Sequence, residues 1–469
     1  MPIEAQSFSV ERAQVEFHNF ASLGEPERNL NYYAEENRRR GSLIRRHRDF
    51  IGELTPFLEI GANAGHSSYM LANEFGADGF ALDISADALR HGRALMDAWN
   101  LKRAPVRLAG DAVNLPFADQ SLRFVCTFQT LSQFMDMDAV FREVARVLQP
   151  GGVFLFAEEP LLRTLSLRLY RCPYYETMKP WERKLYDWGL LGYLVRDVIG
   201  AYQEESFGIR QNHTMHLPDW DALAGRYFIE REYDIFVPER GWGERIVKRA
   251  AFSQRRAAQW LGGTLAGVCR KSGQWPVAGG QLGKFEELLR CPDCKGSLTK
   301  DRDQTLRCAA CAYSAPSEGD VYNLLLSADR SELYPGERDD IIDFSLPGHE
   351  KRLIGDWYAL EGVHGNKFRW IGERADASLR RVKPGPQRLR IRGHASPEGT
   401  PGEVRAMVNG APLHTWKLDR HGLFILEADL PDASEYLVEL HASPVWTPPA
   451  DGRALTVNLS MIRLVDAAT

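Results

Sequence analysis

The chain has 469 residues, of which 44% are hydrophobic, 26% charged and 10% aromatic, so it is too long for one small domain and too apolar for a disordered tail. About three domains are expected, at roughly 150 residues each. The net charge is −5, from 58 Lys and Arg against 63 Asp and Glu, which argues against a protein that coats nucleic acid or an acidic membrane by bulk charge.

The first ten residues lack a basic start followed by an apolar core, and no stretch of 18 residues is free of charge. We therefore expect no signal peptide and no transmembrane segment. Four of the seven cysteines lie close together as two C-x-x-C pairs. This clustering indicates a metal site in a reducing compartment, and we expect the protein to be cytoplasmic.

Residues 1–50 form a predicted helical segment with an arginine-rich run at 37–48, which we interpret as a solvated helix face in preference to an anion site. From 57 to 158, short apolar runs alternate with longer amphipathic ones. Strands are predicted at 56–60, 79–82, 106–108, 124–128 and 152–157, and helices at 67–75, 86–100 and 138–148. Such alternation is typical of a parallel sheet with crossover helices.

Changes of texture along the chain predict the domain boundaries. An α/β domain spans 51–275, with an inserted cap at about 161–250 and a last buried strand at 264–270. The glycine-rich stretch 272–283 is a predicted linker. A compact cysteine-bearing unit follows at 287–326, and the short alternating runs of 331–469 predict an antiparallel β-sandwich.

The clearest motif is the sequence FLEIGANAG at 57–65, where an apolar strand runs into a turn of small residues and then a helix. Glycine at 61 and 65 lets the backbone pass close to a ligand, and the helix start presents free N–H groups. Asp83 follows the second strand, where a carboxylate can accept both hydrogen bonds of a ribose diol. Asp111 follows the third strand, where it could receive an adenine amino group.

Two nucleotide cofactors compete for this arrangement, a nicotinamide dinucleotide and S-adenosylmethionine. A dinucleotide needs glycine at the first, third and sixth positions of the turn so that the backbone can approach a pyrophosphate. Those positions are Gly61, Asn63 and His66, so two of the three fail. The turn therefore favours a cofactor without phosphates.

Residues 55–160 resemble the class I S-adenosylmethionine-dependent methyltransferases. The shared motifs are LEIG at 58–61, Asp83, GDA at 110–112, LPFAD at 115–119 and VARVLQPGG at 144–152. The resemblance implies a Rossmann-like doubly wound sheet, with Glu59, Gly61 and Gly65 around the methionine part, Asp83 on the ribose, and Asp111 with Ala112 at the adenine. It also places Asn63 and Ile84 in the cofactor site, and Phe128 and Gln129 on the sulfonium side.

The sequence departs from the family pattern at three places. Asn63 stands where glycine is usual, and Arg123 stands where aspartate is usual. Asn63 is a mild change, because asparagine tolerates unusual backbone angles. Ser132-Gln133 replaces the usual aromatic or histidine pair, which leaves the general base unassigned. The candidates for that role are Glu158, Glu159, His213 and His216.

Cys291, Cys294, Cys308 and Cys311 follow the pattern C-x2-C-x13-C-x2-C. Four thiolates on paired knuckles favour one closed, tetrahedral and structural Zn²⁺ site over two redox dithiols. The unit resembles the zinc-ribbon activator proteins that partner tRNA and protein methyltransferases. The resemblance implies a docking or stabilising module.

The C-terminal region carries Trp357, Trp370, Trp416 and Trp446 between its predicted strands. Tryptophan here predicts sandwich core first and a ligand platform second, although exposed tryptophan beside Arg or Asp suits carbohydrate recognition. The region resembles accessory β-sandwich modules of bacterial surface-polysaccharide enzymes. We interpret it as a candidate carbohydrate-binding domain.

The preferred hypothesis is an S-adenosylmethionine-dependent methyltransferase that acts on a glycan or sugar-containing precursor in bacterial cell-envelope polysaccharide biosynthesis. The second makes tRNA or rRNA the acceptor, drawing on the arginine stretches 38–48 and 245–256, and the net charge weakens it. The third is a catalytically inactive binding or scaffold protein. No sequence feature predicts an oligomeric state.

Overall fold

The structure is a computed structural model. It describes residues 26–134, 136–162, 164, 179–188, 190, 215–237, 253–274, 283–318, 320–333, 339–344, 349–363, 366–382, 384–448 and 451–466. The described residues divide into two compact units, of which unit 1 holds those from 26 to 327 and unit 2 holds those from 328 onward. Among the described residues, no helix is long and apolar enough to cross a membrane.

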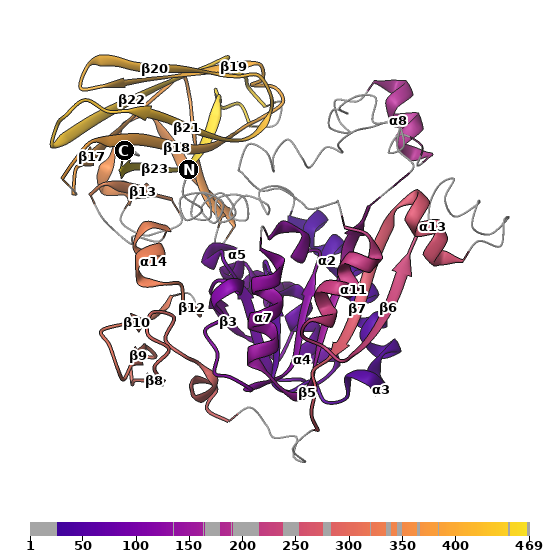
Figure 1. Cartoon of the computed structure of the whole chain (residues 1–469). Helices are drawn as coiled ribbons and strands as arrows, with labels where there is room; N and C mark the ends of the chain where they lie inside the picture. The colour runs from indigo at the N-terminus through magenta and orange to yellow at the C-terminus, as the bar shows by residue number, and fades with distance from the viewer. Residues whose placement is uncertain are drawn as a thin grey trace. The chain divides into compact units, whose positions relative to one another are not determined.

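Unit 1 is built on a sheet with the strand order β11-β12-β3-β2-β1-β4-β5-β7-β6 (Figure 1). The central strands are β1 (Phe57–Ile60), β2 (Gly79–Asp83), β3 (Val106–Ala109), β4 (Leu122–Phe128) and β5 (Leu148–Leu161). All pairings among these five are parallel. Because the strand order reverses between β1 and β4, the loops after β1 to β4 open at the same edge, where ligands bind in such sheets.

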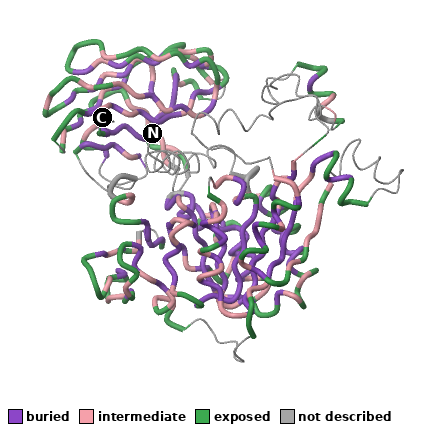
Figure 2. Tube along the Cα trace, in the orientation of Figure 1, coloured by how far each residue is buried: buried purple, intermediate pink, exposed green. Residues whose placement is uncertain are grey.

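Helices cover both faces of this sheet. The helices on one face are α2 (Pro26–Arg46), α3 (Arg48–Ile51) and α4 (His66–Glu74), and those on the other face are α7 (Met137–Val147) and α11 (Leu217–Gly225). Phe124 of β4 packs toward the first face and Val125 toward the second, since successive strand residues point in opposite directions. β1, β2 and β4 are therefore buried at every residue and β3 and β5 at most of theirs, so purple dominates the sheet in Figure 2.

The predicted helix at 86–100 is wrong in one respect, because the structure divides it into α5 (Ala86–Arg90) and α6 (Gly92–Ala98). A Cβ added at Gly92 would lie 2.6 Å from the carbonyl oxygen of Ala64. Glycine at this position lets α6 approach the turn after β1, and the helix breaks where that approach begins. Short 3-10 turns follow β3 and β4 as η1 (Ala112–Asn114) and η2 (Leu131–Gln133).

The sheet continues in antiparallel fashion beyond β5. The predicted last strand is β7 (Gly263–Arg270), which pairs with β5 and with β6 (Glu230–Phe236). Other described elements of this region are α8 (Pro180–Asp187) and α13 (Gln254–Leu261). Much of the expected cap at 161–250 lies outside the described residues, and β6 from that range belongs to the sheet.

The cysteine-bearing segment packs on the other edge of the same sheet. Its elements are η4 (Phe285–Leu288), β8 (Leu298–Lys300), β9 (Leu306–Cys308), β10 (Ser314–Ala315), β11 (Ser317–Glu318) and β12 (Val321–Asn323). β12 pairs with β3 in parallel, and Leu298 and Tyr313 share a core with Phe117. So short a segment has little core of its own, which gives a physical reason for this docking.

Unit 2 consists of antiparallel sheets that share one core. One sheet contains β15 (Trp357–Val363), β16 (Asn366–Ile371), β23 (Val457–Asp466), β18 (Gln387–Ala395) and β21 (Gly422–Asp429), with β13 (Ile341–Asp343) paired to β23. The other contains β14 (Leu353–Ile354), β17 (Arg374–Arg380), β22 (Glu435–Ser443), β19 (Gly402–Val408) and β20 (Ala411–Leu418). Ile391 and Val404 meet in the core between them, so the predicted antiparallel sheets are confirmed. The remaining elements are α14 (Ser327–Leu333) and η5 (His349–Arg352).

Candidate functional site

A pocket lies where the loops after β1 to β4 meet, with about 380 Å³ of empty space, part of it open to solvent. Its lining residues are Ile60, Gly61, Leu82, Asp83, Ile84, Gly110, Asp111, Ala112, Thr130, Gln133 and Phe134. Apolar side chains form most of the wall, and two carboxylates interrupt it. Such a pocket suits a ligand with flat apolar faces and hydrogen-bond donors at its edges, which describes a purine nucleoside.

Asp83 is fixed at the end of β2 by two backbone groups. One carboxylate oxygen accepts a hydrogen bond from the backbone amide of Asn63 at 2.7 Å, and the other accepts one from the backbone amide of Ser85 at 2.9 Å. Each oxygen keeps further lone-pair capacity, so the group can still accept from a diol. Asn63 has a positive φ of 51°, a conformation that asparagine adopts more readily than most residues. The unusual residue in the turn therefore serves to orient the predicted ribose acid.

Asp111 begins the 3-10 turn after β3. Its side chain accepts the amide of Val113 at 3.0 Å, which caps η1. Asp111 and the buried Ala112 both line the pocket, together with Gly110. The structure thus places the two residues predicted for the adenine on the same wall as Asp83 and Ile84.

Gly61 lies at the crossing of two loops. Its φ is +70°, and an added Cβ would lie 2.4 Å from Cγ2 of Thr130. Glycine is required here both for the turn and for the close approach of the loop after β4. The sequence motifs did not assign Thr130, Gln133 and Phe134 to the cofactor site, although their position directly after β4 is a signal that could have found them.

Four other residues predicted around the cofactor lie near the pocket but are not part of its described lining. Glu59 is buried and accepts a hydrogen bond from Ser68 at 2.5 Å, which ties β1 to α4, and burial raises its pKa to about 7. Gly65 precedes α4 in the left-handed conformation. Phe128 lies beneath a guanidinium group, and Gln129 is exposed. Their roles toward a cofactor stay predictions.

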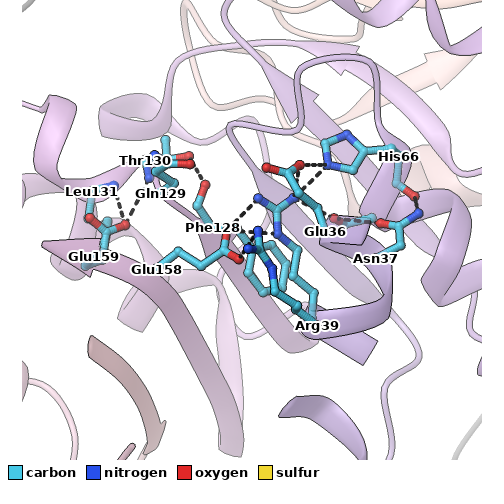
Figure 3. A network of polar contacts seen from close by, with 12 residues as sticks. Glu36, Asn37, Arg39, His66, Phe128, Gln129, Thr130, Leu131, Glu158 and Glu159 are labelled. Carbon is cyan, nitrogen blue, oxygen red and sulfur yellow. Dashed lines mark hydrogen bonds and ion pairs between the residues drawn. The ribbon is translucent and has the colours of Figure 1, made fainter. Parts of the chain in front are cut away.

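The neighbouring part of the edge is filled by a polar network centred on Arg40 of α2 (Figure 3). Arg40 is 5% exposed, and its Nη2 donates to Glu158 at 2.7 Å. Its Nη1 lies 2.7 Å from Nε2 of His66 and donates to Ser67 at 2.9 Å. The guanidinium also stacks over the ring of Phe128, 4.6 Å from its centroid. One side chain thus joins α2 to the start of α4 and the ends of β4 and β5.

Glu36 and His66 complete this network. Glu36 lies 2.8 Å from Nε2 of His66 and 3.4 Å from Nη1 of Arg40. Burial opposes ionisation of Glu36, yet contacts with His66 and Arg40 lower its pKa, while burial lowers the pKa of His66. The interpretation of the arginine run as a solvated face is therefore wrong for Arg40, which is buried and pairs with the buried Glu36 and the partly buried Glu158.

Glu158 and Glu159 are adjacent but have different roles (Figure 3). Glu159 is fully buried and accepts the backbone amides of Thr130, Leu131 and Ser132 at 2.9 to 3.0 Å. Burial raises its pKa to about 7 although these donors favour the ionised form. Glu158 pairs with Arg40 and also lies 3.3 Å from Arg39. Glu159 is thus bonded to backbone amides, and Glu158 is paired with arginine side chains.

The two histidine candidates for a general base are His216 and His213. His216 precedes α11, and its backbone amide donates to Asp219 at 2.7 Å. His216 thus occupies the N-cap position of α11. His213 lies outside the described residues, so its role stays a prediction.

The four knuckle cysteines come together as the sequence predicted. Their sulfur atoms all lie within 4.8 Å of one another. Cys291 lies 3.7 Å from Cys311, and Cys294 lies 3.4 Å from Cys308 and 3.5 Å from Cys311. A tetrahedron of thiolates about 2.3 Å from Zn²⁺ has edges of about 3.8 Å. The sulfur cluster therefore fits a single four-coordinate ion.

Comparison with known proteins connects this edge to a family. Residues 58–156 match the family model described as a methyltransferase domain. The chain is 33% identical to the methyltransferase GfsG of Streptomyces halstedii over 110 residues, which cover 23% of this chain and 39% of that protein. It is 30% identical to a fatty-acid O-methyltransferase of Mycolicibacterium smegmatis over 131 residues, which cover 28% of this chain and 42% of that protein.

A crystal structure of the PH0226 protein from Pyrococcus horikoshii OT3 aligns with 51% of this chain and 92% of that chain, at a TM-score of 0.33 and 18% identity. The chain spans about two fifths of the length of the curated relatives named above. The matched residues run from β1 into β5 and contain all four pocket loops. Residues 58–156, which carry the pocket, are therefore similar to a methyltransferase domain.

Proposed function

We propose that the protein is an S-adenosylmethionine-dependent methyltransferase. The observation that carries the proposal is the pocket at the carboxyl edge of β1 to β4, where Asp83 and Asp111 face apolar walls inside the matched domain. A sulfonium cofactor with no phosphates suits this set of groups, since the lining offers acceptors for ribose and adenine and, among its residues, no Lys or Arg for a pyrophosphate. Asp83 would hold the ribose diol, and Asp111 with Ala112 would hold the adenine.

S-adenosylmethionine supplies an electrophilic methyl group to the acceptor nucleophile. The chain supplies orientation, which can contribute much of the rate when donor and acceptor are held at near-attack distance. Glu159 holds the loop after β4 through three backbone amides, and Arg40 holds that strand end against α2. In this proposal both are positioning residues, because their polar atoms are already engaged within the protein.

Calorimetry with S-adenosylhomocysteine tests the proposal directly. We expect binding to the wild-type protein and strong weakening in Asp83→Asn and Asp111→Asn. Arg388→Gln serves as a control, because Arg388 lies in unit 2 and pairs with Asp429. Absence of binding to the wild-type protein would favour the catalytically inactive scaffold.

For the acceptor we propose a small molecule and, more specifically, a glycan or sugar-containing precursor. Half-buried aromatic residues in unit 2 support this choice. The ring centroids of Trp370 and Trp446 lie 5.9 Å apart, and the guanidinium of Arg453 lies over the ring of Tyr358. Transfer of a labelled methyl group would be measured on cell-envelope saccharides, fatty acids and RNA in parallel. Label on saccharides supports the specific proposal, and label confined to fatty acids or RNA would replace it.

RNA as the acceptor loses support from the environment of the N-terminal arginines. Most of the arginines in the described run pair with acids, as in Arg38 with Glu35, Arg40 with Glu158, Arg45 with Glu74 and Arg46 with Asp234. Paired guanidinium groups leave less net positive charge for phosphates. RNA binding that weakens steeply with salt would restore this alternative.

We further propose that Cys291, Cys294, Cys308 and Cys311 hold one structural Zn²⁺. The four sulfurs would fill every coordination position, so the ion would stabilise the segment and take no part in methyl transfer. Metal analysis should give one zinc per chain. Cys294→Ser should lower this content, whereas substitution of Cys269, which is buried in β7, should not.

A further inference from the structure

The first cysteine knuckle, residues 291–295, contacts the loop that forms the adenine wall of the pocket. Asn114, the last residue of η1, is the point of contact. Its Nδ2 donates to the carbonyl of Pro292 at 3.5 Å, and its Oδ1 accepts a hydrogen bond from Nζ of Lys295. Asn114 thus bonds through both ends of its side-chain amide to the first cysteine knuckle.

Asn114 is joined in turn to the pocket. Its backbone amide donates to the carbonyl of Asp111 at 3.2 Å, across a single 3-10 turn. Asp111 and Ala112 of that turn line the pocket. A shift of the knuckle would therefore reach the adenine wall through three residues of chain.

Other contacts of the cysteine-bearing segment hold the chain on both sides of this turn. Before it, Leu324 donates its backbone amide to Ala109 at 2.7 Å. After it, the backbone amide of Arg290 donates to the carbonyl oxygen of Pro116 at 3.0 Å. The backbone amide of Ala118 donates to the carbonyl oxygen of Leu288 at 2.8 Å. The pocket loop is thus clamped at its ends, and the knuckle contacts its middle.

The conformation of the knuckle depends on its cysteines. Lys295 has a positive φ of 60° and directly follows Cys294, which is exposed. Two backbone hydrogen bonds close this turn. The amide of Lys295 donates to the carbonyl oxygen of Cys291, and the amide of Cys291 donates to the carbonyl oxygen of Gly296. A bound ion would cross-link this turn to Cys308 and Cys311 of the second pair and would thereby hold Lys295 and Pro292 against Asn114.

We infer that metal retention and cofactor binding are coupled through the contact of Lys295 and Pro292 with Asn114, with Lys295 as a positioning residue. The inference rests on the proposed function. The coupling is reciprocal by thermodynamic necessity, so the cofactor should tighten zinc binding by the same factor by which zinc tightens cofactor binding. A coupling of roughly 5-fold or more is the usual range for such linked sites.

The experiment uses the full-length zinc-loaded protein. The Kd for Zn²⁺ is measured by equilibrium competition with a chromogenic chelator, with and without saturating S-adenosylhomocysteine. For the wild-type protein we expect S-adenosylhomocysteine to protect the metal by lowering this Kd about 5-fold or more. For Lys295→Met and Asn114→Ala we expect this protection to be mostly lost and the Kd for S-adenosylhomocysteine to rise about 5-fold. In turnover, KM for S-adenosylmethionine should rise with little change in kcat.

Lys300→Met is the matched control, because Lys300 lies on the same segment and stacks over Phe285, away from Asn114. It should behave as the wild-type protein does. Equal protection in Lys295→Met, Asn114→Ala and the control would overturn the coupling alone. A protein that binds S-adenosylhomocysteine but holds no zinc would also overturn it, whereas failure of the wild-type protein to bind S-adenosylhomocysteine would overturn the proposed function as well.

Discussion

The carboxyl edge of the unit 1 sheet has two halves that use charge in different ways. Around β2 and β3, Asp83 and Asp111 line an open pocket and accept hydrogen bonds from backbone amides. Around β4 and β5, Arg40, Glu36 and Glu158 neutralise one another within the protein. The carboxylates of the first half can still accept hydrogen bonds from a ligand. The charged groups of the second half are bonded to one another and hold the chain segments together.

This difference teaches how a buried charge can be classified. Asp83 has two backbone donors and no salt-bridge partner among the described residues, and it lies on a pocket wall. Glu159 has three backbone donors but holds the loop after β4 from beneath. Burial alone does not separate the two roles, whereas access to a pocket does.

The largest effect should come from Arg40→Met, which leaves the buried Glu36 without its guanidinium partner and Glu158 with only the half-exposed Arg39. Breaking a buried ion pair by removing one member costs about 3 to 5 kcal/mol of unfolding free energy. Native-state hydrogen exchange of α4 amides would measure this loss. Adding Glu36→Gln should recover part of it, and a loss below about 1 kcal/mol would contradict the importance of the network.

Glu159→Gln should change how stability depends on pH. The pKa of Glu159 is about 7 in the folded protein against an ordinary value of 4.5, so folding keeps a proton that the unfolded chain loses. Its contribution is complete below about pH 4.5 and is lost as the pH rises through 7. Across this window the variant should lose less stability than the wild-type protein, by on the order of 3 kcal/mol.

Denaturant unfolding at several pH values would check this prediction. The comparison is between the two pH profiles, so contributions from other buried groups such as His66 and Glu59 cancel. Parallel profiles for the variant and the wild-type protein would show that folding does not raise the pKa of Glu159.

Asp83→Asn should weaken binding of S-adenosylhomocysteine by about 2 to 3 kcal/mol, or roughly 30- to 100-fold, because charge-assisted hydrogen bonds become neutral ones. Calorimetry gives the Kd, and hydrogen exchange gives the stability of unit 1. A large change in stability with little change in Kd would place Asp83 in the structural half of the edge, against the comparison above.

Arg39→Ala should have the smallest effect. Arg39 lies on the solvent side of the network, with a half-exposed side chain 3.3 Å from Glu158. An exposed pair of this kind contributes below about 1 kcal/mol. A loss in unfolding free energy comparable to that of Arg40→Met would show that the network extends to the surface.

The parts predicted from sequence are those whose residues are close in the chain or follow a strand. The four cysteines lie within one short segment, so their spacing alone predicted a cluster that the structure brings within 4.8 Å. Asp83 and Asp111 were found because the ends of parallel strands meet at one edge. Thr130 obeys the same rule and was missed, because the shared motifs assign Phe128 and Gln129 and give no role to the next residue.

The parts that sequence could not predict depend on contacts between distant segments. The arginine run looks like an exposed helix face, because the acid that buries Arg40 is Glu158, more than 100 residues away. The docking of the cysteine-bearing segment depends in the same way on pairing of β12 with β3. A local sequence pattern does not show which distant residue or strand will be the partner, so these contacts can be identified only from the fold.

The pairing of β12 with β3 also sets an order of events during synthesis. Val321 must find Arg107, more than 200 residues earlier in the chain. At roughly 5 to 20 residues per second, β3 leaves the ribosome at least 10 s before its neighbour exists. Throughout that interval β3 is an unpaired strand edge, which other nascent chains could bind. The cysteine-bearing segment therefore ends the period in which this sheet is open to aggregation.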